Sequence, residues 1–196
     1  MASGVNRVVT ARISTECQWD QVAEALRRVT VEIFGPSGRG AGVVWSSDGV
    51  IITNAHVVQG TSMVRFQDER TCHAELLAKD RIADLAMLRI PVVGIECVKL
   101  RDARTLRAGE MVVAVGHPFG EAGAVSLGIV HTASSGPLIE ADIRLAPGNS
   151  GGPLADAEGH VVGINCMVAN GMGIAISTVA IQRFLREIPS SVQRAG

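Results

Sequence analysis

The fold class is decided by the stretch Val31-Glu32-Ile33-Phe34, Ala41-Gly42-Val43-Val44-Trp45 and Val50-Ile51-Ile52, which are short apolar runs with glycine-containing turns between them. Runs of this length that are rich in β-branched residues favour strands over helices. Similar runs follow at residues 63–66, 74–77 and 85–88. Six strands at this close spacing predict a closed antiparallel barrel over about residues 29–95.

The second half of the chain repeats this pattern after a charged connector. Short apolar runs lie at residues 111–115, 124–130, 138–141, 153–155, 161–164 and 173–176. They predict a second barrel over about residues 108–176, with the seam between the barrels near residues 95–108. We therefore expect an all-β protein built from two six-stranded antiparallel β-barrels.

A short helix is expected at each end of the chain. In the N-terminal segment, residues 1–28, apolar residues recur at helical spacing and predict a helix that packs on a barrel. These positions are Trp19, Val22, Leu26 and Val29. Near the C-terminus, Ser177 or Thr178 can cap a helix over about residues 178–188, which Pro189 ends. Residues 190–196 are expected to form a tail.

The composition excludes several classes of function. Lys and Arg number 18 and Asp and Glu 19, which gives a formal net charge of −1 and argues against electrostatic binding of nucleic acid. Aromatic residues make up 3% of the chain and tyrosine is absent, so few side chains are available to stack on nucleic-acid bases. A hydrophobic content of 47% indicates a packed core rather than disorder. We expect no nucleic-acid partner.

The sequence gives two expectations about localisation. No run of 18 apolar residues is present, so no membrane span is expected. Charges at Arg7, Arg12 and Glu16 are not typical of a signal peptide. We expect a cytoplasmic protein, or a periplasmic or organellar one if a targeting segment has been removed.

The widely spaced cysteines are interpreted as buried free thiols rather than as a disulfide framework: Cys17, Cys72, Cys97 and Cys166.

The segment Ala146-Pro147-Gly148-Asn149-Ser150-Gly151-Gly152-Pro153-Leu154 carries the strongest chemical signal. A serine in a tight glycine-rich turn has an accessible hydroxyl, and the backbone N–H groups around it can converge on one anion-binding space. Such a space stabilises the oxyanion that forms in acyl transfer. Taken alone, a turn of this composition is more often structural than catalytic.

Two other segments supply the partners that a nucleophilic serine needs. His56 follows an apolar strand in Thr53-Asn54-Ala55-His56-Val57-Val58, and Asp84 precedes one in Asp84-Leu85-Ala86-Met87-Leu88. Separately, the histidine could be a packed side chain at the inner edge of a barrel, and the aspartate a turn residue. Together with Ser150 they provide a base, a carboxylate and a nucleophile in the chain order His, Asp, Ser, which is one of the known orders for a catalytic triad.

These three segments resemble those of the chymotrypsin-like serine proteases of the HtrA/Deg group. Supporting matches are Gly116-His117-Pro118-Phe119-Gly120, Gly128-Ile129-Val130 and Val162-Gly163-Ile164-Asn165. The resemblance runs from about residue 30 to residue 188 and implies a trypsin-like serine protease domain over residues 29–189.

The resemblance implies a role for each residue of the triad. Ser150 would attack the scissile carbonyl, His56 would accept and then donate its proton, and Asp84 would orient the imidazole. The backbone N–H groups of Gly148 and Ser150, with Asn149 between them, would form the oxyanion hole. No metal or organic cofactor is needed. Because histidine must be neutral to act as a base, we expect activity to rise through about pH 6.5–7.5.

The resemblance also implies a substrate pocket with several walls. The expected substrate-binding residues are Arg144, Leu145, Asn165, Cys166, Met167, Gly173 and Ile174. This set favours small or medium aliphatic residues before the scissile bond. Arg144 departs from the alanine that is common in the group: directed to the pocket floor it would select acidic residues, and directed to solvent, which we favour, it would leave the aliphatic preference unchanged.

Two departures from the group affect regulation. Only residues 131–137 lie between the Gly128-Ile129-Val130 segment and the next strand, where the group has a long regulatory loop, and we expect no PDZ domain within these 196 residues. We therefore expect no activation by PDZ-bound peptides within this chain. The group is often trimeric, but its aromatic N-terminal residues are sparse here, so the oligomeric state is open.

The predicted function is a serine endopeptidase acting on unfolded or exposed protein segments in protein quality control. The alternative is a protein-binding or chaperone module with low or regulated cleavage.

Overall fold

The computed structural model describes residues 16–36, 38–60, 62–133 and 136–189. Within them, the first barrel contains β1 (Thr30–Gly35), β2 (Gly38–Val44), β3 (Val50–Thr53), β4 (Ser62–Arg65), β5 (Thr71–Asp80) and β6 (Leu85–Arg89). The second contains β7 (Met111–Gly116), β8 (Ala124–Ala133), β9 (Leu138–Ile143), β10 (Pro153–Asp156), β11 (Val161–Ala169) and β12 (Met172–Ser177). The helices are α1 (Glu16–Arg28) and α2 (Thr178–Glu187), with short 3-10 turns η1 (Ala103–Thr105) and η2 (Pro118–Gly120).

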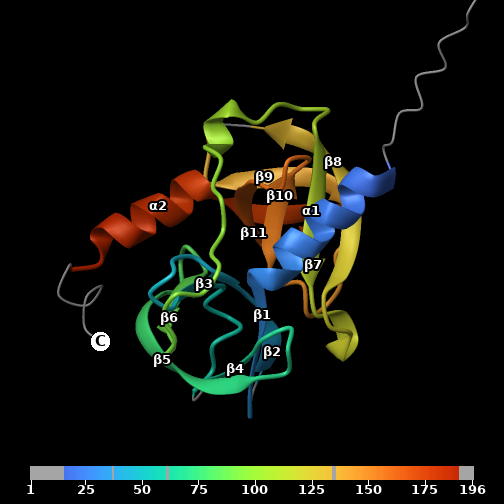
Figure 1. Cartoon of the computed structure of the whole chain (residues 1–196). Coiled ribbons are helices and arrows are strands. Elements are labelled where there is room, and N and C mark those ends of the chain that lie inside the picture. The colour runs from blue at the N-terminus through green and yellow to red at the C-terminus, as the bar shows by residue number, and fades with distance from the viewer. Residues whose placement is uncertain (1–15, 37, 61, 134–135, 190–196) are drawn as a thin grey trace, which may run out of the picture.

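Both sheets close into antiparallel barrels (Figure 1). The strand order around the first is β1-β2-β3-β6-β5-β4, and around the second it is β10-β11-β12-β9-β8-β7. The connector from β6 to β7, green in Figure 1, runs from the first barrel to the far end of the second. The predicted all-β class with two six-stranded barrels is therefore confirmed.

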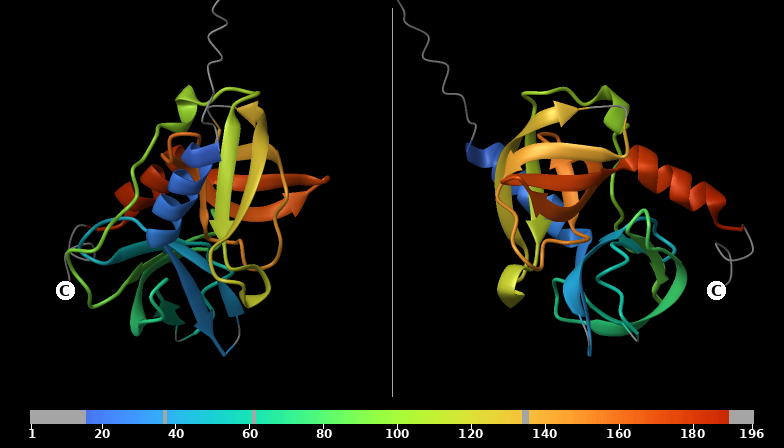
Figure 2. Two further views of the ribbon diagram at one scale, coloured as in Figure 1. Left: turned by 45° about the vertical axis from the view of Figure 1, so that its right-hand side comes forward. Right: turned by 180° about the vertical axis from the view of Figure 1, so that it is seen from behind.

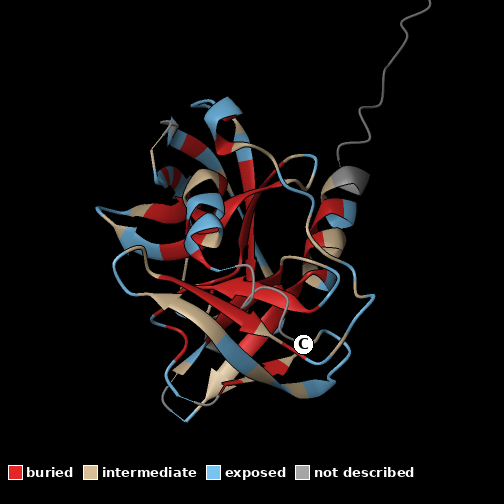
Figure 3. Ribbon diagram, turned by 90° about the vertical axis from the view of Figure 1, so that its left-hand side faces the viewer, coloured by how far each residue is buried: buried red, intermediate tan, exposed pale blue. Residues whose placement is uncertain are grey.

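The two barrels share an apolar interface that also receives α2. Ile52 and Leu85 of the first barrel belong to the same buried cluster as Ile164 of the second and Ile181 and Phe184 of α2. The buried residues accordingly continue from one barrel into the other in Figure 3. Such continuous packing fixes the position of each barrel relative to its neighbour.

The two helices have different partners. Helix α1 lies across the outside of β7 (Figure 2), where Val22 and Leu26 bury Val113 and Val115. Helix α2 begins at the predicted cap, because the Ser177 hydroxyl accepts a hydrogen bond from the backbone N–H of Ala180. Among the described residues, no helix is long and apolar enough to cross a membrane.

Strand β11 is longer than its sequence pattern predicts. The apolar run at residues 161–164 continues as strand to Ala169, with a register shift between Asn165 and Met167. Pairing with β12 supports this extension, and a local sequence pattern does not contain that contribution. The extension carries Cys166 toward the seam between the barrels.

Candidate active site

His56 lies in the turn after β3, on the first barrel. Asn54 before it is fully buried, and its side-chain amide donates to the backbone carbonyl of Asp84 at 3.1 Å. The His56 side chain is 49% exposed. The interpretation of this residue as a packed side chain at the inner edge of a barrel is therefore wrong: the turn is anchored by Asn54, and the imidazole faces the cleft.

Asp84 precedes β6 and holds His56 through both of its carboxylate oxygens. Its Oδ2 lies 2.8 Å from His56 Nδ1, and its Oδ1 accepts from the His56 backbone N–H at 3.0 Å. Asp84 has a positive φ of 53°, which is unusual for a residue with a side chain. Its backbone carbonyl accepts from the N–H of Ala55. Hydrogen bonds to both the backbone and the side chain of Asp84 therefore hold this strained conformation.

The pKa of Asp84 reflects opposing effects. Burial raises it, but hydrogen bonds from the His56 side chain, the Cys166 thiol and the His56 backbone N–H outweigh burial and hold the pKa below its ordinary value. The carboxylate therefore stays ionised at neutral pH. An ionised acceptor beside Nδ1 favours the tautomer in which Nε2 is unprotonated and can act as a base.

Ser150 lies in a turn that belongs to the second barrel but is bound to the first. The Ser150 carbonyl accepts from the backbone N–H of Ala41 in β2 at 2.8 Å. A side chain at Gly151 would place its Cβ 2.1 Å from the Ala41 carbonyl oxygen and 2.2 Å from the hydroxyl oxygen of Thr53. Glycine is therefore required here, where φ is 83° and the turn lies against Ala41 and Thr53 of the first barrel.

The turn before Ser150 leaves two backbone donors without a protein partner. The Asn149 N–H donates to the carbonyl of Ala146, which closes the turn around Gly148, whose φ is 107°. The Gly148 carbonyl accepts from the His117 N–H at 3.1 Å, so it is directed into the protein. Within the described part of the chain, no acceptor is bonded to the N–H of Gly148 or of Ser150. These two donors are thus available to an anion.

Cys166 contacts both Asp84 and Ser150. Its thiol donates to Asp84 Oδ2 at 3.2 Å, and its backbone carbonyl accepts from the Ser150 hydroxyl at 3.1 Å. Burial and the neighbouring Asp84 carboxylate raise the pKa of the thiol to about 12, so it remains a protonated donor. Sequence reasoning placed Cys166 only in the wall of a pocket, because the contact with Asp84 joins residues from two barrels.

The Ser150 hydroxyl is directed to the Cys166 carbonyl and not to His56. Among the described residues, no hydrogen bond joins Ser150 to the His56 imidazole. The predicted triad residues therefore come together at the seam between the barrels, with the His56–Asp84 contact made and the Ser150–His56 contact open. Catalytic hydrogen bonds are often long before substrate binds.

A cavity of about 340 Å³ opens beside Ser150. Its lining includes four of the predicted substrate-binding residues: Leu145, Asn165, Cys166 and Met167. Arg144 is exposed and does not line it. Gly173 and Ile174 lie outside the lining too. A Cβ at Gly173 would lie 3.1 Å from the side chain of Leu145, so this glycine leaves space for Leu145 in the cavity wall.

The cysteines differ from the expectation in part. Of the cysteines whose side chains the structure describes, all are free, but only Cys166 is buried, and Cys72 and Cys97 are partly exposed.

Arg101, in the charged connector between the barrels, is paired with two carboxylates. It donates to Glu110 at 2.6 Å and to Asp156 at 3.3 Å.

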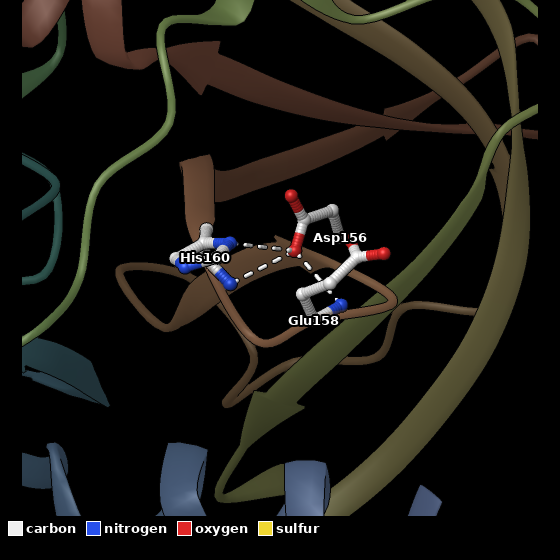
Figure 4. Close-up of side chains that lie close together, drawn as sticks. All are labelled: Asp156, Glu158 and His160. Atoms are coloured by element: carbon white, nitrogen blue, oxygen red, sulfur yellow. Dashed lines mark hydrogen bonds and ion pairs between the residues drawn. The ribbon is translucent and has the colours of Figure 1, made fainter. Parts of the chain in front are cut away.

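Another group of polar side chains lies away from this site, in the turn between β10 and β11. Asp156, Glu158 and His160 come close enough to suggest a metal site (Figure 4). However, Asp156 Oδ1 accepts from the backbone N–H groups of Glu158 and His160, and its Oδ2 accepts from the Arg101 guanidinium. A carboxylate whose oxygens already accept these hydrogen bonds, with an arginine beside it, stabilises the hairpin and is a poor ligand for a metal cation.

Comparison with known proteins gives the class. Residues 40–164 match the model of the trypsin-like peptidase domain. The chain belongs to the trypsin-like peptidase domain family, and the predicted resemblance to HtrA/Deg serine proteases is confirmed.

Particular relatives place it within that family. The "Probable periplasmic serine endoprotease DegP-like" of Hahella chejuensis is 38% identical over 164 residues, which cover 76% of this chain and 35% of the relative. "Serine protease HTRA1" of Xenopus tropicalis is 37% identical over 167 residues, covering 78% of this chain and 36% of the relative. The chain therefore spans about a third of the length of these relatives.

Solved structures agree with this placement. A serine endoprotease from Yersinia pestis superimposes with a TM-score of 0.81 at 28% identity, covering 87% of this chain and 66% of that one. The HtrA-type protease AlgW with a tripeptide superimposes with a TM-score of 0.81 at 27% identity, covering 88% and 64% of the two chains.

Proposed function

We propose that this chain is a serine endopeptidase that cleaves unfolded or exposed protein segments through His56, Asp84 and Ser150. The observation that carries the proposal is the His56–Asp84 pair at 2.8 Å, set beside a serine turn with two unpartnered backbone N–H groups. This combination supplies an oriented base, a nucleophile and an anion site, which are the parts that acyl transfer needs.

The reaction would proceed in two steps. When a peptide enters, the Ser150 hydroxyl turns from the Cys166 carbonyl to His56 Nε2, which takes its proton as Oγ attacks the scissile carbonyl carbon. The oxyanion accepts hydrogen bonds from the N–H groups of Gly148 and Ser150, and His56 then gives its proton to the leaving amine. Water, activated by the same imidazole, hydrolyses the acyl-enzyme and frees Ser150.

We further propose a preference for small or medium aliphatic residues before the scissile bond. Leu145, Met167 and Val168 contribute apolar surface to the cavity beside Ser150, and about 340 Å³ suits a side chain of that size. Arg144 is exposed, which supports the solvent-directed alternative for its guanidinium.

A fluorophosphonate probe tests the proposal directly. The wild-type protein should be labelled and the Ser150→Ala variant should not, because the probe captures only an activated serine. A disulfide-containing protein that has been unfolded by reduction and alkylation should be cleaved by the wild type alone. An unlabelled wild-type protein would favour the other candidate.

That second candidate is a protein-binding or chaperone module with low or regulated cleavage. The open contact between Ser150 and His56 favours it, because a serine bonded to the Cys166 carbonyl is not activated. Suppression of the aggregation of an unfolded protein by Ser150→Ala, at the level of the wild type, would support this role.

We propose a periplasmic compartment for this protein, because its relatives with the DegP-like name are described as periplasmic.

A further inference from the structure

A second cavity is lined by His56 and Asp84 and shares no lining residue with the cavity beside Ser150. We call it the β5 groove, and its volume is about 840 Å³. Its lining includes His56, Val58, Lys79, Arg81 and Asp84. An extended peptide advances about 3.3 Å per residue, so the few residues next to a side chain beside Ser150 span enough length to reach past His56.

Lys79, near the end of β5, contributes a fixed positive charge to the groove. Its ammonium donates to the backbone carbonyl of Val58, which ties β5 to the loop after His56. One of its three N–H donors is used in this way, so two remain for a ligand. Because the side chain is already held, little rotamer entropy remains to be lost when an anion binds.

Arg81 adds a second cation on the same wall. It lies in the turn after β5, which Asp80 fixes by accepting from the backbone N–H groups of Ile82 and Ala83. Arg81 is exposed, and Ile82 beside it is 100% exposed. The turn therefore presents a guanidinium and an apolar side chain next to the groove.

Neither cation is neutralised by the protein. Among the described residues, Lys79 and Arg81 form no ion pair with a carboxylate. The carboxylate that does line the groove, Asp84, is bonded to His56 and Cys166. Most other charged side chains around the first barrel, such as Arg39 and Arg65 with Glu32, are paired. The lining of the groove thus carries two cations without a carboxylate partner and one carboxylate that is already bonded.

We propose that the β5 groove is a substrate subsite for a carboxylate, held by Lys79 and Arg81. This inference rests on the proposed peptidase function and adds a second determinant to the aliphatic cavity. The carboxylate can come from an aspartate or glutamate side chain of the substrate or from its free C-terminus. Both sources present the same planar anion to an ammonium and a guanidinium.

A peptide series tests this subsite. Each peptide carries a single valine for the cavity beside Ser150 and one glutamate or glutamine at successive positions on both sides of it. The series is made with amidated and with free C-termini. We compare kcat/KM, and in parallel the binding of the dye-labelled peptides to Ser150→Ala, for the wild-type groove and for Lys79→Met, Lys79→Arg and Arg81→Gln.

Matched controls are available in this chain. Lysine occurs only at positions 79 and 99, so Lys99→Met removes the same charge away from the groove. Arg186→Gln on α2 does the same for arginine, because Arg186 is exposed there.

The expected result is a preference for glutamate over glutamine of about threefold to fivefold at one or two adjacent positions, the range for a partly exposed charge pair. The preference should disappear in Lys79→Met and Arg81→Gln, persist in Lys79→Arg and in both controls, and weaken in about 0.5 M salt. A preference that depends on the free C-terminus identifies the terminal carboxylate as the source.

Equal cleavage of glutamate and glutamine peptides overturns the subsite but leaves the proposed function intact. An equal loss in Lys99→Met also overturns it, because the effect would then be one of net charge. If no peptide is cleaved, the proposed function fails, and the binding measurement still decides whether the groove selects a carboxylate.

Discussion

The thiol of Cys166 offers a sharp test of how the site is held together. It donates to Asp84 Oδ2 at 3.2 Å, the same oxygen that faces His56 Nδ1. Replacing Cys166 with valine keeps an apolar side chain of similar size in the cavity wall but removes the donor. Replacing it with serine keeps a donor. The two variants therefore separate the hydrogen bond from the packing.

The magnitude follows from the chemistry of the donor. A hydrogen bond to a charged group contributes about 1.5–3 kcal/mol, but a thiol is a weak donor, so we take about 1 kcal/mol for this contact. That is about a fivefold loss of kcat in Cys166→Val, with KM little changed, because the bond orients Asp84 and does not touch the peptide. Cys166→Ser should stay within about twofold of the wild type.

The assay is steady-state hydrolysis of a valine-containing peptide between about pH 5 and pH 9. Without the thiol, the Asp84 carboxylate has one stabilising hydrogen bond fewer, so the loss of kcat in Cys166→Val should be largest on the acid side of the profile. Equal losses in the serine and valine variants would refute the reasoning, since the thiol would then act through its shape. A change confined to KM would assign Cys166 to substrate binding alone.

Three further predictions concern separate parts of the site. Gly148→Ala should lower kcat by about a hundredfold or more, because the new Cβ would lie 2.3 Å from the His117 carbonyl oxygen and rotate an oxyanion donor; near-normal kcat would contradict this. Arg101→Met should lower the free energy of unfolding by about 2–3 kcal/mol, measured in urea, because it leaves the buried Asp156 carboxylate without its cation; a loss below about 0.5 kcal/mol would show that the hairpin N–H groups suffice. Asp84→Asn should be less stable than the wild type near pH 6, and the difference in Tm should shrink as pH falls below about 4, because a lowered folded-state pKa adds stability that is lost on protonation; a constant difference would contradict it.

The sequence is sufficient for the barrels because each strand carries its own signal. Apolar β-branched runs such as 50–52 and 161–164, separated by glycine, predict strands without knowledge of their partners. The second half of β11 has a weaker signal, because its apolar residues Met167 and Val168 are exposed and pair with β12 outside the core. The order His56, Asp84, Ser150 likewise indicates the class of site from local segments alone.

Contacts between residues far apart in the chain lie beyond a local sequence pattern. The thiol of Cys166 reaches Asp84 across 82 positions of the chain, and Arg101 reaches Asp156 across 55. A cysteine in a strand and an arginine in a charged connector look the same whether or not they have these partners. Their roles depend on which surfaces the fold brings together, and that is a property of tertiary packing.

The division of the site between two barrels gives the interface a direct effect on chemistry. The first barrel supplies His56 and Asp84, the second supplies Ser150, and the contacts that join them include the Ala41 N–H to the Ser150 carbonyl at 2.8 Å and the Cys166 thiol to Asp84 at 3.2 Å. A displacement of one barrel by about 1 Å would lengthen both contacts together and misplace the proposed nucleophile, Ser150, relative to the proposed base, His56, a change that can cost about a hundredfold in rate. Because the same interface buries the apolar cluster around Ile52 and Ile164, substitutions there should reduce activity before they unfold the protein.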